Sequence, residues 1–380
     1  MKTNWPTKKL GEVTQLQMGE TLIKKDLTNE GVPVYSADAL DVPWGFTSNN
    51  RLIFNKGSII IGARGTIGSV KLPMDEEFTA TQTTIVLTPN TKEVNSDFLH
   101  YFLKKINLKN IRGGTGIPML TIGHLSTVQI PLPPFPTQQK IVKILDTIQS
   151  AVEIQEKIIG KTKELKKSLM AELFKYGAPS FRKGRKLKKT GIGEIPEDWE
   201  VVRLGDVFKI VAGGDISKLN FSSTKTDKFI YPIYSNTIAN NGLYGFADTY
   251  QFEGNCITVT ARGTIGYAIP RFEKFNAIIR LLVLIPKINL NIIYVSEFIN
   301  EKIRVAFENT SIPQLTVPRF SIFKIPLPPL PEQQEITEIL QTIDQKIEIE
   351  QKKKALYEEL FRTMLNKIMS QEIDVEKIEL

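Results

Sequence analysis

Two long segments of the chain, residues 137–177 and 332–371, carry apolar residues alternately four and three positions apart. This spacing is typical of the contact face of a coiled coil. The apolar positions are Ile141, Leu145, Ile148, Val152, Ile159, Leu169 and Leu173 in the first segment, and Ile336, Leu340, Ile343, Ile347, Tyr357, Phe361, Met364 and Ile368 in the second. The pattern predicts two helices of about 40 residues, or roughly 60 Å each.

Proline and glycine mark the ends of these helices. Pro136 and Pro331 stand at the first turn, where a missing N–H costs nothing, and Gly177 suits the left-handed residue that follows a helix. The sequence IPLPP precedes each helix, beginning at Ile130 and at Ile325. We expect the fixed φ of these prolines to make a stiff exit that cannot be absorbed into a sheet.

The connection between the helices predicts their relative direction. From Gly177 to Glu194 it has 18 residues, which span about 60 Å when fully extended. A parallel pair would use this whole length to bring the chain back along the first helix, whereas an antiparallel pair needs no return. We therefore predict an antiparallel pair, as a rod with a globular domain at each end and a pseudo-twofold axis. Two separate helical hairpins or a homodimeric coil are the alternatives.

The joint before each helix belongs to a longer internal repeat. The sequence IPLPPFPTQQKIVKILDTIQ at Ile130 returns 195 residues later as IPLPPLPEQQEITEILQTID. WPTKKLGEV at Trp5 matches WEVVRLGDV at Trp199, and ARGTIG occurs at Ala63 and again at Ala261. Between these anchors the copies diverge, so the scaffold is repeated while the surface differs.

Outside the helices, short β-branched runs alternate with turn signals, and LIFNKGSIIIGARGTIGSVKL from Leu52 predicts three strands joined by turns. Short helices are expected near Ser96 and Tyr294. The predicted fold class is α+β: two tandem pseudo-symmetric α/β domains with mainly antiparallel sheets, separated by two long antiparallel helices that form a coiled coil. The predicted divisions are a first domain at 1–136, a first helix at 137–177, a basic linker at 178–194, a second domain at 195–331, a second helix at 332–371 and a C-terminal tail at 372–380.

Composition narrows the class of partner. The 380 residues are 41% hydrophobic and 24% charged, as in ordinary globular proteins. A net charge of +8 favours a polyanion, nucleic acid before an anionic membrane surface. The single cysteine, Cys256, excludes an intramolecular disulfide and fits a reducing compartment. Because the N-terminus lacks an apolar core and Arg280 interrupts the most apolar window, we expect no signal peptide, no membrane span and a cytoplasmic location.

The repeated ARGTIG sequence is the main candidate for contact with nucleic acid. Its glycines can supply positive φ in a tight turn, or Arg64 and Arg262 can contact phosphates or bases, and the sequence leaves both interpretations open. The run RKGRKLKK at Arg182 predicts a solvated, flexible tether, with a phosphate-contacting arm as the alternative. Further basic candidates in divergent loops are Lys24, Lys25, Lys109 and Arg112.

Motifs that would support catalysis are missing from the sequence. There is no Walker motif, no methyltransferase signature, no nuclease core and no pairing of a nucleophile with a base. His100 and His124 are the only histidines, and neither is expected to bind a metal or to act in catalysis. The sequence therefore predicts a binding protein.

The tandem IPLPP-x-P-x-QQ-x-I joints, the long helices that follow them, the repeated LG-[ED]-V entries and the ARGTIG turns resemble the specificity subunit of type I restriction–modification systems. The resemblance covers the whole chain. Each half of the family starts with an IP-x-x-W segment; IPEDW at Ile195 supplies the second, whereas the first is shortened to NWP at Asn4.

The resemblance implies a non-catalytic subunit that recognises double-stranded DNA. Each globular half would be a target recognition domain for one half of an asymmetric, bipartite site, and the helices would set the spacing between the half-sites, about 34 Å or one helical turn. Two methyltransferase subunits would dock on the helices and bring S-adenosylmethionine, and restriction subunits with ATP and Mg²⁺ could join them. The chain itself would hold no cofactor and no metal.

Candidate base-contacting residues follow from the same resemblance. Arg64 and Arg262 come first, followed by two loops that occupy corresponding positions in the halves. These loops contain Thr81 and Gln82 in the first half, and Asn276 and Arg280 in the second. The alternative function is a tandem-domain coiled-coil scaffold that binds protein or carbohydrate.

Overall fold

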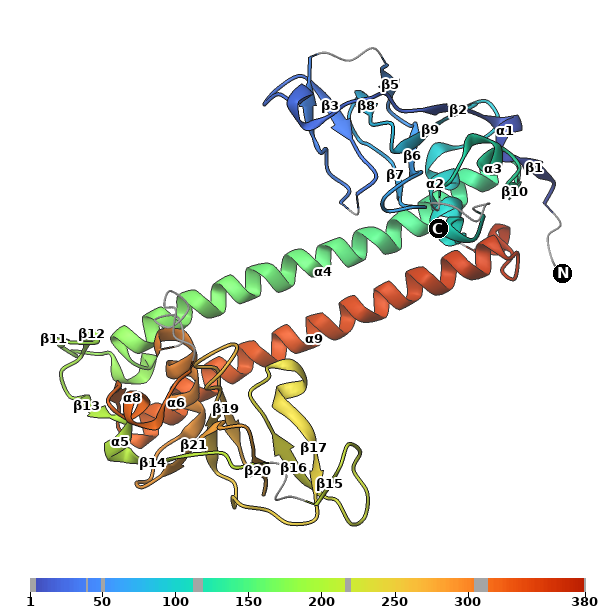
Figure 1. The fold of residues 1–380 in the computed structure, drawn as a ribbon. Coiled ribbons are helices and arrows are strands. Elements are labelled where there is room, and N and C mark those ends of the chain that lie inside the picture. The colour runs from blue at the N-terminus through green and yellow to red at the C-terminus, as the bar shows by residue number, and fades with distance from the viewer. Residues whose placement is uncertain are drawn as a thin grey trace. The chain divides into compact units, whose positions relative to one another are not determined.

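The computed structural model describes residues 5–38, 40–48, 52–111, 119–215, 220–303 and 314–378. The chain divides into two compact units, the first made of residues 1–157 and 351–380 and the second of residues 158–350. Each unit contains two four-stranded sheets, short helices and a part of each long helix (Figure 1). The α+β class and the tandem arrangement are as predicted, whereas the finer domain divisions stay predictions.

The first unit is built on two four-stranded sheets, with strand orders β2–β9–β6–β7 and β4–β3–β8–β5. Their strands pair antiparallel except for β3 with β8. The strands are β2 (Thr14–Met18), β3 (Val32–Tyr35), β4 (Gly45–Thr47), β5 (Phe54–Asn55), β6 (Ile59–Gly62), β7 (Val70–Lys71), β8 (Glu77–Ala80) and β9 (Thr84–Pro89). A separate pair joins β1 (Thr7–Lys9) to β10 (Gln129–Pro131).

Side chains of the strands β6 and β9 alternate between two cores, as the period of a strand requires. Ile59 and Ile85 pack with the short helices and the long helices, whereas Ile60 and Val86 pack against the second sheet. The short helices of this unit are α1 (Leu10–Val13), α2 (Ser96–Lys105) and α3 (Ile122–Ser126), with 3₁₀ turns η1 (Lys24–Asp26), η2 (Leu108–Ile111) and η7 (Val375–Lys377). The helix predicted near Ser96 is therefore confirmed.

The second unit repeats the strand order of the first sheet; in its second sheet a strand is added at one edge, and a single bridge between Phe252 and Phe275 stands in place of β5. Its sheets run β14–β21–β18–β19 and β15–β17–β16–β20, and the pair β13–β22 corresponds to β1–β10. The strands are β11 (Leu187–Thr190), β12 (Gly193–Pro196), β13 (Glu200–Arg203), β14 (Phe208–Ala212), β15 (Phe221–Ser222), β16 (Tyr231–Tyr234), β17 (Leu243–Ala247), β18 (Cys256–Val259), β19 (Ala268–Arg271), β20 (Asn276–Ala277), β21 (Leu282–Pro286) and β22 (Lys324–Leu327). The helices and turns are η3 (Pro179–Phe181), α5 (Leu204–Val207), η5 (Ala239–Gly242), α6 (Ile292–Phe298), the π-helical turn η6 (Ile299–Ile303) and α8 (Val317–Ser321).

The long helices are α4 (Phe135–Tyr176) and α9 (Leu330–Met369), as the apolar spacing predicts. Gly177 follows α4 with a φ of 81°, the left-handed conformation expected at that position. In the first unit Glu156 of α4 pairs with Lys354 of α9, and Thr137, near the start of α4, pairs with Glu376, which follows the end of α9. Residue numbers on the α9 side therefore fall as they rise along α4.

Contacts in the second unit show the same antiparallel order of residue numbers. Lys166 pairs with Asp344, and the backbone N–H of Ala178 donates to Glu332. The antiparallel direction is therefore confirmed in each unit. The predicted rod concerns the placement of the units relative to each other and stays a prediction.

The prolines of the IPLPP joints behave differently from the prediction. Pro131 pairs with Thr7, and Pro326 pairs with Val201, so each joint begins inside a two-stranded sheet. A proline fits there because an edge position needs its carbonyl and not an N–H; the Pro326 carbonyl accepts a hydrogen bond from the Tyr294 hydroxyl at 3.1 Å. The expectation that these prolines stay outside any sheet was wrong. Among the described residues no helix is long and apolar enough to cross a membrane.

Candidate nucleic-acid interface

The ARGTIG turn has the same conformation in both units. Gly65 and Gly68 have φ of 75° and 76°, and Gly263 and Gly266 have φ of 69° and 82°. These values are accessible to glycine at little cost, so the structural interpretation of the glycines is correct. The same turns leave the side chains of the two arginines exposed. The conformational role of glycine and a contact role for arginine are therefore compatible.

Each exposed arginine is held in place by its neighbours. In the first unit the N–H groups of Ala63 and Arg64 both donate to the carbonyl of Thr83, at 2.8 and 3.0 Å, and the Arg64 Nε lies 3.0 Å from the sulfur of Met119. In the second unit the Arg262 Nη2 donates to the Gln314 Oε1 at 3.0 Å. Since one nitrogen of each guanidinium is anchored, the other donors point from a fixed position on the surface.

In the first unit the Arg64 turn borders a pocket of about 280 Å³. Gln82 lies in the same pocket, where its Oε1 accepts a hydrogen bond from the N–H of Leu22 at 3.2 Å. Thr81 also lines the pocket, but it is only 4% exposed and its hydroxyl pairs with Thr83 at 2.7 Å. The structure thus brings three predicted residues together, and it gives Thr81 a supporting position behind the surface.

The pocket also contains a carboxylate that the sequence did not single out. Asp38 pairs with the Lys71 ammonium at 2.5 Å and accepts a hydrogen bond from Ser36. Burial alone would raise the pKa of Asp38, but the hydrogen bonds from Lys71 and Ser36 outweigh burial and lower it. Asp38 is therefore ionised and can accept hydrogen bonds, for example from an amino group on a base edge. Trp44 lies beside it at the pocket wall.

The second unit has a tight turn at the corresponding place. Arg280 is exposed and follows Ile279 in a turn that Asn236 connects to the ARGTIG sequence, because Asn236 accepts from the Ala261 N–H at 2.6 Å and donates to the Ile279 carbonyl. Asn276, in contrast, lies inside strand β20 with 0% exposure and donates to the Thr249 carbonyl. Because Asn276 is fully buried, its side chain cannot contact a base, and the prediction that it does so is corrected.

The remaining basic candidates have different environments. Lys24 and Lys25 are exposed in η1, and Lys109 is exposed in η2. The turn η2 lies beside the ARGTIG turn of the first unit, because a Cβ at Gly68 would be 3.1 Å from that of Leu108. Lys109 is therefore placed beside Gly68 of the ARGTIG turn. Arg112 lies outside the described residues.

The basic run from Arg182 is anchored in the second unit, and the predicted flexible tether was wrong. Arg182 donates to the Gly177 carbonyl, and Arg185 pairs with both Asp198 and Glu332. Lys188 donates to two backbone carbonyls. Most of these acceptors are backbone carbonyls or lie within about 13 residues of their donors, and Glu332 lies 147 residues from Arg185, so charge patterning could not reveal the contacts. Lys183, Lys186 and Lys189 remain exposed.

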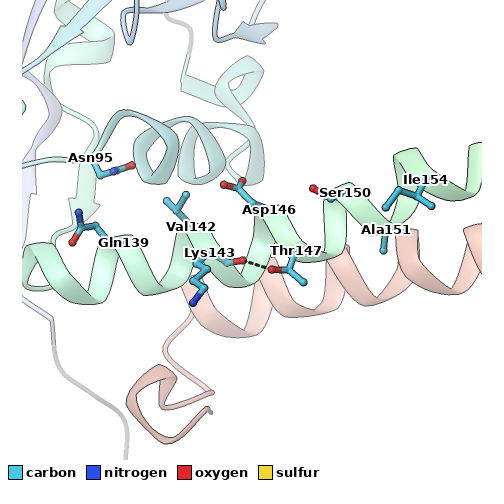
Figure 2. A pocket seen from close by; sticks show the side chains of 9 residues that line it. All are labelled: Asn95, Gln139, Val142, Lys143, Asp146, Thr147, Ser150, Ala151 and Ile154. Carbon is cyan, nitrogen blue, oxygen red and sulfur yellow. Dashed lines mark hydrogen bonds between the residues drawn. The ribbon is translucent and has the colours of Figure 1, made fainter. Parts of the chain in front are cut away.

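A separate groove of about 600 Å³ runs along α4 beside the start of α2 (Figure 2). Asn95, at the N-terminus of α2, faces Gln139 across the groove, and the row from Val142 to Ile154 forms its floor. Asp146 accepts a hydrogen bond from the Tyr101 hydroxyl at 2.5 Å. Its lining combines Val142, Ala151 and Ile154 with uncharged polar side chains, one lysine and one carboxylate. This mixture, without an excess of positive charge, suits protein docking better than DNA binding.

Two titratable groups outside these surfaces, His100 and Cys256, have pKa values that burial shifts toward the uncharged form. Burial lowers the pKa of His100 to about 3 and raises the pKa of the Cys256 thiol to about 11. Within the described parts of the chain, no cluster of three or more histidine, cysteine, aspartate or glutamate residues could hold a metal ion.

Comparison with known proteins gives a consistent result. Residues 2–164 and 196–359 match the family model described as the type I restriction modification DNA specificity domain. The type I restriction enzyme MjaVIII specificity subunit of Methanocaldococcus jannaschii is 28% identical over 347 residues, covering 85% of this chain and 78% of the relative. The MjaIX specificity subunit of the same organism is 26% identical over 355 residues, covering 86% and 80%.

Two solved structures share the fold. The S subunit of a type I restriction–modification system from M. genitalium has a TM-score of 0.62 at 19% identity, over 96% of both chains. A chain from a study of complex assembly and conformational transition of the type I system has a TM-score of 0.63 at 19% identity, over 96% of this chain and 97% of the other. At this identity the likeness concerns the fold alone.

Proposed function

Because the chain belongs to the family of type I restriction–modification specificity subunits, we propose that each of its units recognises one half of an asymmetric, bipartite DNA site. The observation that carries this proposal is the pair of ARGTIG turns, each of which presents an anchored, exposed arginine beside residues that differ between the units. The same scaffold with different neighbours favours two half-sites of different sequence.

The side chains around each turn have the chemistry of direct base recognition. The free guanidinium donors of Arg64 and Arg262 match the N7 and O6 acceptors of guanine, and Asp38 can accept from the amino group of cytosine. Lys24, Lys25 and Lys109 carry exposed charges that suit backbone phosphates. Base contacts would supply the sequence preference, and phosphate contacts would supply most of the affinity.

We propose further that the long helices set the half-site spacing and dock two methyltransferase subunits. Support comes from exposed apolar residues that recur at the repeat distance: Ile154 and Ile349 are 54% and 53% exposed, and Leu165 and Leu360 are 53% and 44% exposed. Each unit contains one isoleucine and one leucine of this set. Two equivalent apolar patches fit two copies of one partner, and the groove in Figure 2 extends the patch around Ile154.

In this assembly the chain supplies recognition, and its partners supply chemistry. The methyltransferase subunits would bind S-adenosylmethionine, and restriction subunits, where present, would bind ATP and Mg²⁺. The chain would act in the cytoplasm, as a non-catalytic subunit on double-stranded DNA.

A methylation map tests the proposal. Adenine methylation is mapped across the genome in cells that express the chain with its methyltransferase, and in cells that lack this chain alone. We expect a split motif with two unlike halves that disappears with the chain. An unchanged methylation pattern, in a pair shown to assemble and to be active, would contradict the proposal and favour a protein-binding scaffold.

A further inference from the structure

The turn between β20 and β21 of the second unit has an unfavourable backbone conformation. The N–H of Leu281 donates to the carbonyl of Ile278 at 3.1 Å, and the two residues between them, Ile279 and Arg280, have φ of 53° and 59°. Two successive left-handed residues define a turn that normally contains asparagine and glycine. For a β-branched residue such as isoleucine, a positive φ is a true outlier.

The surrounding structure imposes this conformation. The N–H groups of Ile279 and Arg280 donate to the carbonyls of Gly214 and Gly213, at 3.0 and 3.3 Å. A Cβ at Gly213 would lie 2.7 Å from the backbone of Ala277, so only glycine allows this approach. Asn236 adds a hydrogen bond to the Ile279 carbonyl and ties the turn to the backbone that carries Arg262. Such over-determined strain is typical of binding sites.

The strained turn places an apolar side chain on the surface. Ile279 is 45% exposed, so its unfavourable φ is not offset by burial in the core. In the first unit the corresponding turn is closed in the same way, from the Thr84 N–H to the Thr81 carbonyl at 2.9 Å, but Gln82 and Thr83 between them do not have positive φ. Only the second unit therefore combines strain with an exposed aliphatic group at this position.

We propose that Ile279 is a specificity-determining residue of the second unit, and that it contacts the 5-methyl group of a thymine in the major groove. This inference rests on the proposed function and names the base that one surface recognises. The thymine methyl is the apolar group that a base edge presents in the major groove. Asn236 fixes the distance between Ile279 and the Arg262 turn, so the aliphatic contact and the guanidinium act on neighbouring positions of one half-site.

The test uses the full assembly of the chain with its methyltransferase subunits and a duplex that contains the split motif from the methylation map. Each thymine of the second half-site is replaced in turn by deoxyuridine, which lacks the methyl group. At one position we expect the affinity of the wild-type assembly to fall about fourfold, as for one buried methyl group. The variants Ile279→Gly and Ile279→Asn suit a positive φ and should bind both duplexes equally. Deoxyuridine in the first half-site should change the affinity of the variants and of the wild type by the same factor.

Several results would overturn the inference. They are a second half-site without a thymine, insensitivity of the wild type to every deoxyuridine, or variants that keep the wild-type sensitivity. If the affinity of the variants falls by the same factor below that of the wild type on the thymine duplex and on the deoxyuridine duplex, Ile279 inserts between base pairs instead. A split motif whose binding does not change with any deoxyuridine refutes only this inference. The absence of a split motif refutes the proposed function as well.

Discussion

The two units use the same sheet and the same turns, yet they support their exposed arginines with different residues. Behind Arg64 the structure places a relaxed turn and the ionised pair of Asp38 and Lys71. Beside Arg262 it places a strained turn that the Asn236 amide holds. The comparison shows that the backbone frame fixes where a recognition residue stands, whereas the surrounding loops are free to change its chemistry.

The attachment of the long helices differs in the same way. In the first unit Tyr101 packs on Phe361, with ring centroids 5.7 Å apart, and donates to Asp146. At the equivalent position of the second unit Glu297 pairs with Lys166, which also pairs with Asp344. Burial alone would lower the pKa of Lys166, but the two carboxylates raise it, so the ammonium stays charged. One unit uses an aromatic contact where the other uses a charged cluster.

The largest effect is expected where the second unit encloses a carboxylate. Glu332 is fully buried, and it accepts hydrogen bonds from Arg185 and from the indole of Trp199. Arg185→Met leaves this charge without its cation, which should destabilise the second unit by about 3 kcal/mol. The matched change in the first unit, Thr137→Val, removes an exposed hydrogen bond to Glu376 and should cost less than about 1 kcal/mol. Hydrogen exchange, followed separately in each unit, measures the loss of stability in each variant. Equal losses in the two units would contradict this difference between them.

A smaller effect is expected at the charged cluster on α4. Lys166→Met should destabilise the second unit by about 2 kcal/mol, because it leaves Glu297 partly buried without its cation. The double variant Lys166→Met with Glu297→Leu should recover most of this loss, since it removes both charges. Denaturation of the single and double variants gives the coupling free energy between Lys166 and Glu297. If the losses of stability in the single variants add up in the double variant, the two residues do not act as a pair.

Loss of one arginine should affect one half-site only. Arg64→Ala should reduce discrimination at one base pair of the first half-site about tenfold, or about 1.4 kcal/mol, and Arg262→Ala should do the same in the second. The matched Arg→Lys changes keep the charge and lose the fork, so they should restore affinity better than discrimination. Competition binding with single-base variants of the motif measures this. A uniform loss over all sequences would show that these arginines contact phosphates instead.

The smallest effect concerns pH. Because burial lowers the pKa of His100 to about 3, the unfolded chain binds a proton below pH 6.5 that the folded unit does not bind. The contribution of His100 to the free energy of unfolding is therefore complete above pH 6.5. This free energy falls by about 1 kcal/mol between pH 6.5 and 5.5. His100→Gln should remove this slope from the first unit. The second unit has Ser296 at the corresponding position and should not show it; an unchanged slope in the variant would assign it to other groups.

The frame of the molecule could be predicted from the sequence because it depends on local signals. Apolar spacing located α4 and α9, proline and glycine marked their ends, and the length of one connection gave their direction. The repeat located the ARGTIG turns, and glycine explained their φ values.

The surfaces could be predicted only in part, because they depend on contacts between distant residues. No local signal indicates that Asn276 is buried or that Arg185 is bound by Glu332. The pair of Asp38 and Lys71 joins the loop after β3 of one sheet to strand β7 of the other. The strain at Ile279 also escaped prediction, since nothing in its own sequence favours a positive φ and the conformation is imposed by Gly213, Gly214 and Asn236.

The most direct test of the central claim, that each unit recognises its own half-site, is an exchange of one unit. Residues 1–136 are replaced by the corresponding segment of another member of the family, and the methylated motif is mapped in cells that carry the hybrid with its methyltransferase. The account predicts that one half of the motif changes while the other half and the gap between them stay the same. A change in both halves, or an unchanged motif in an active hybrid, would contradict it.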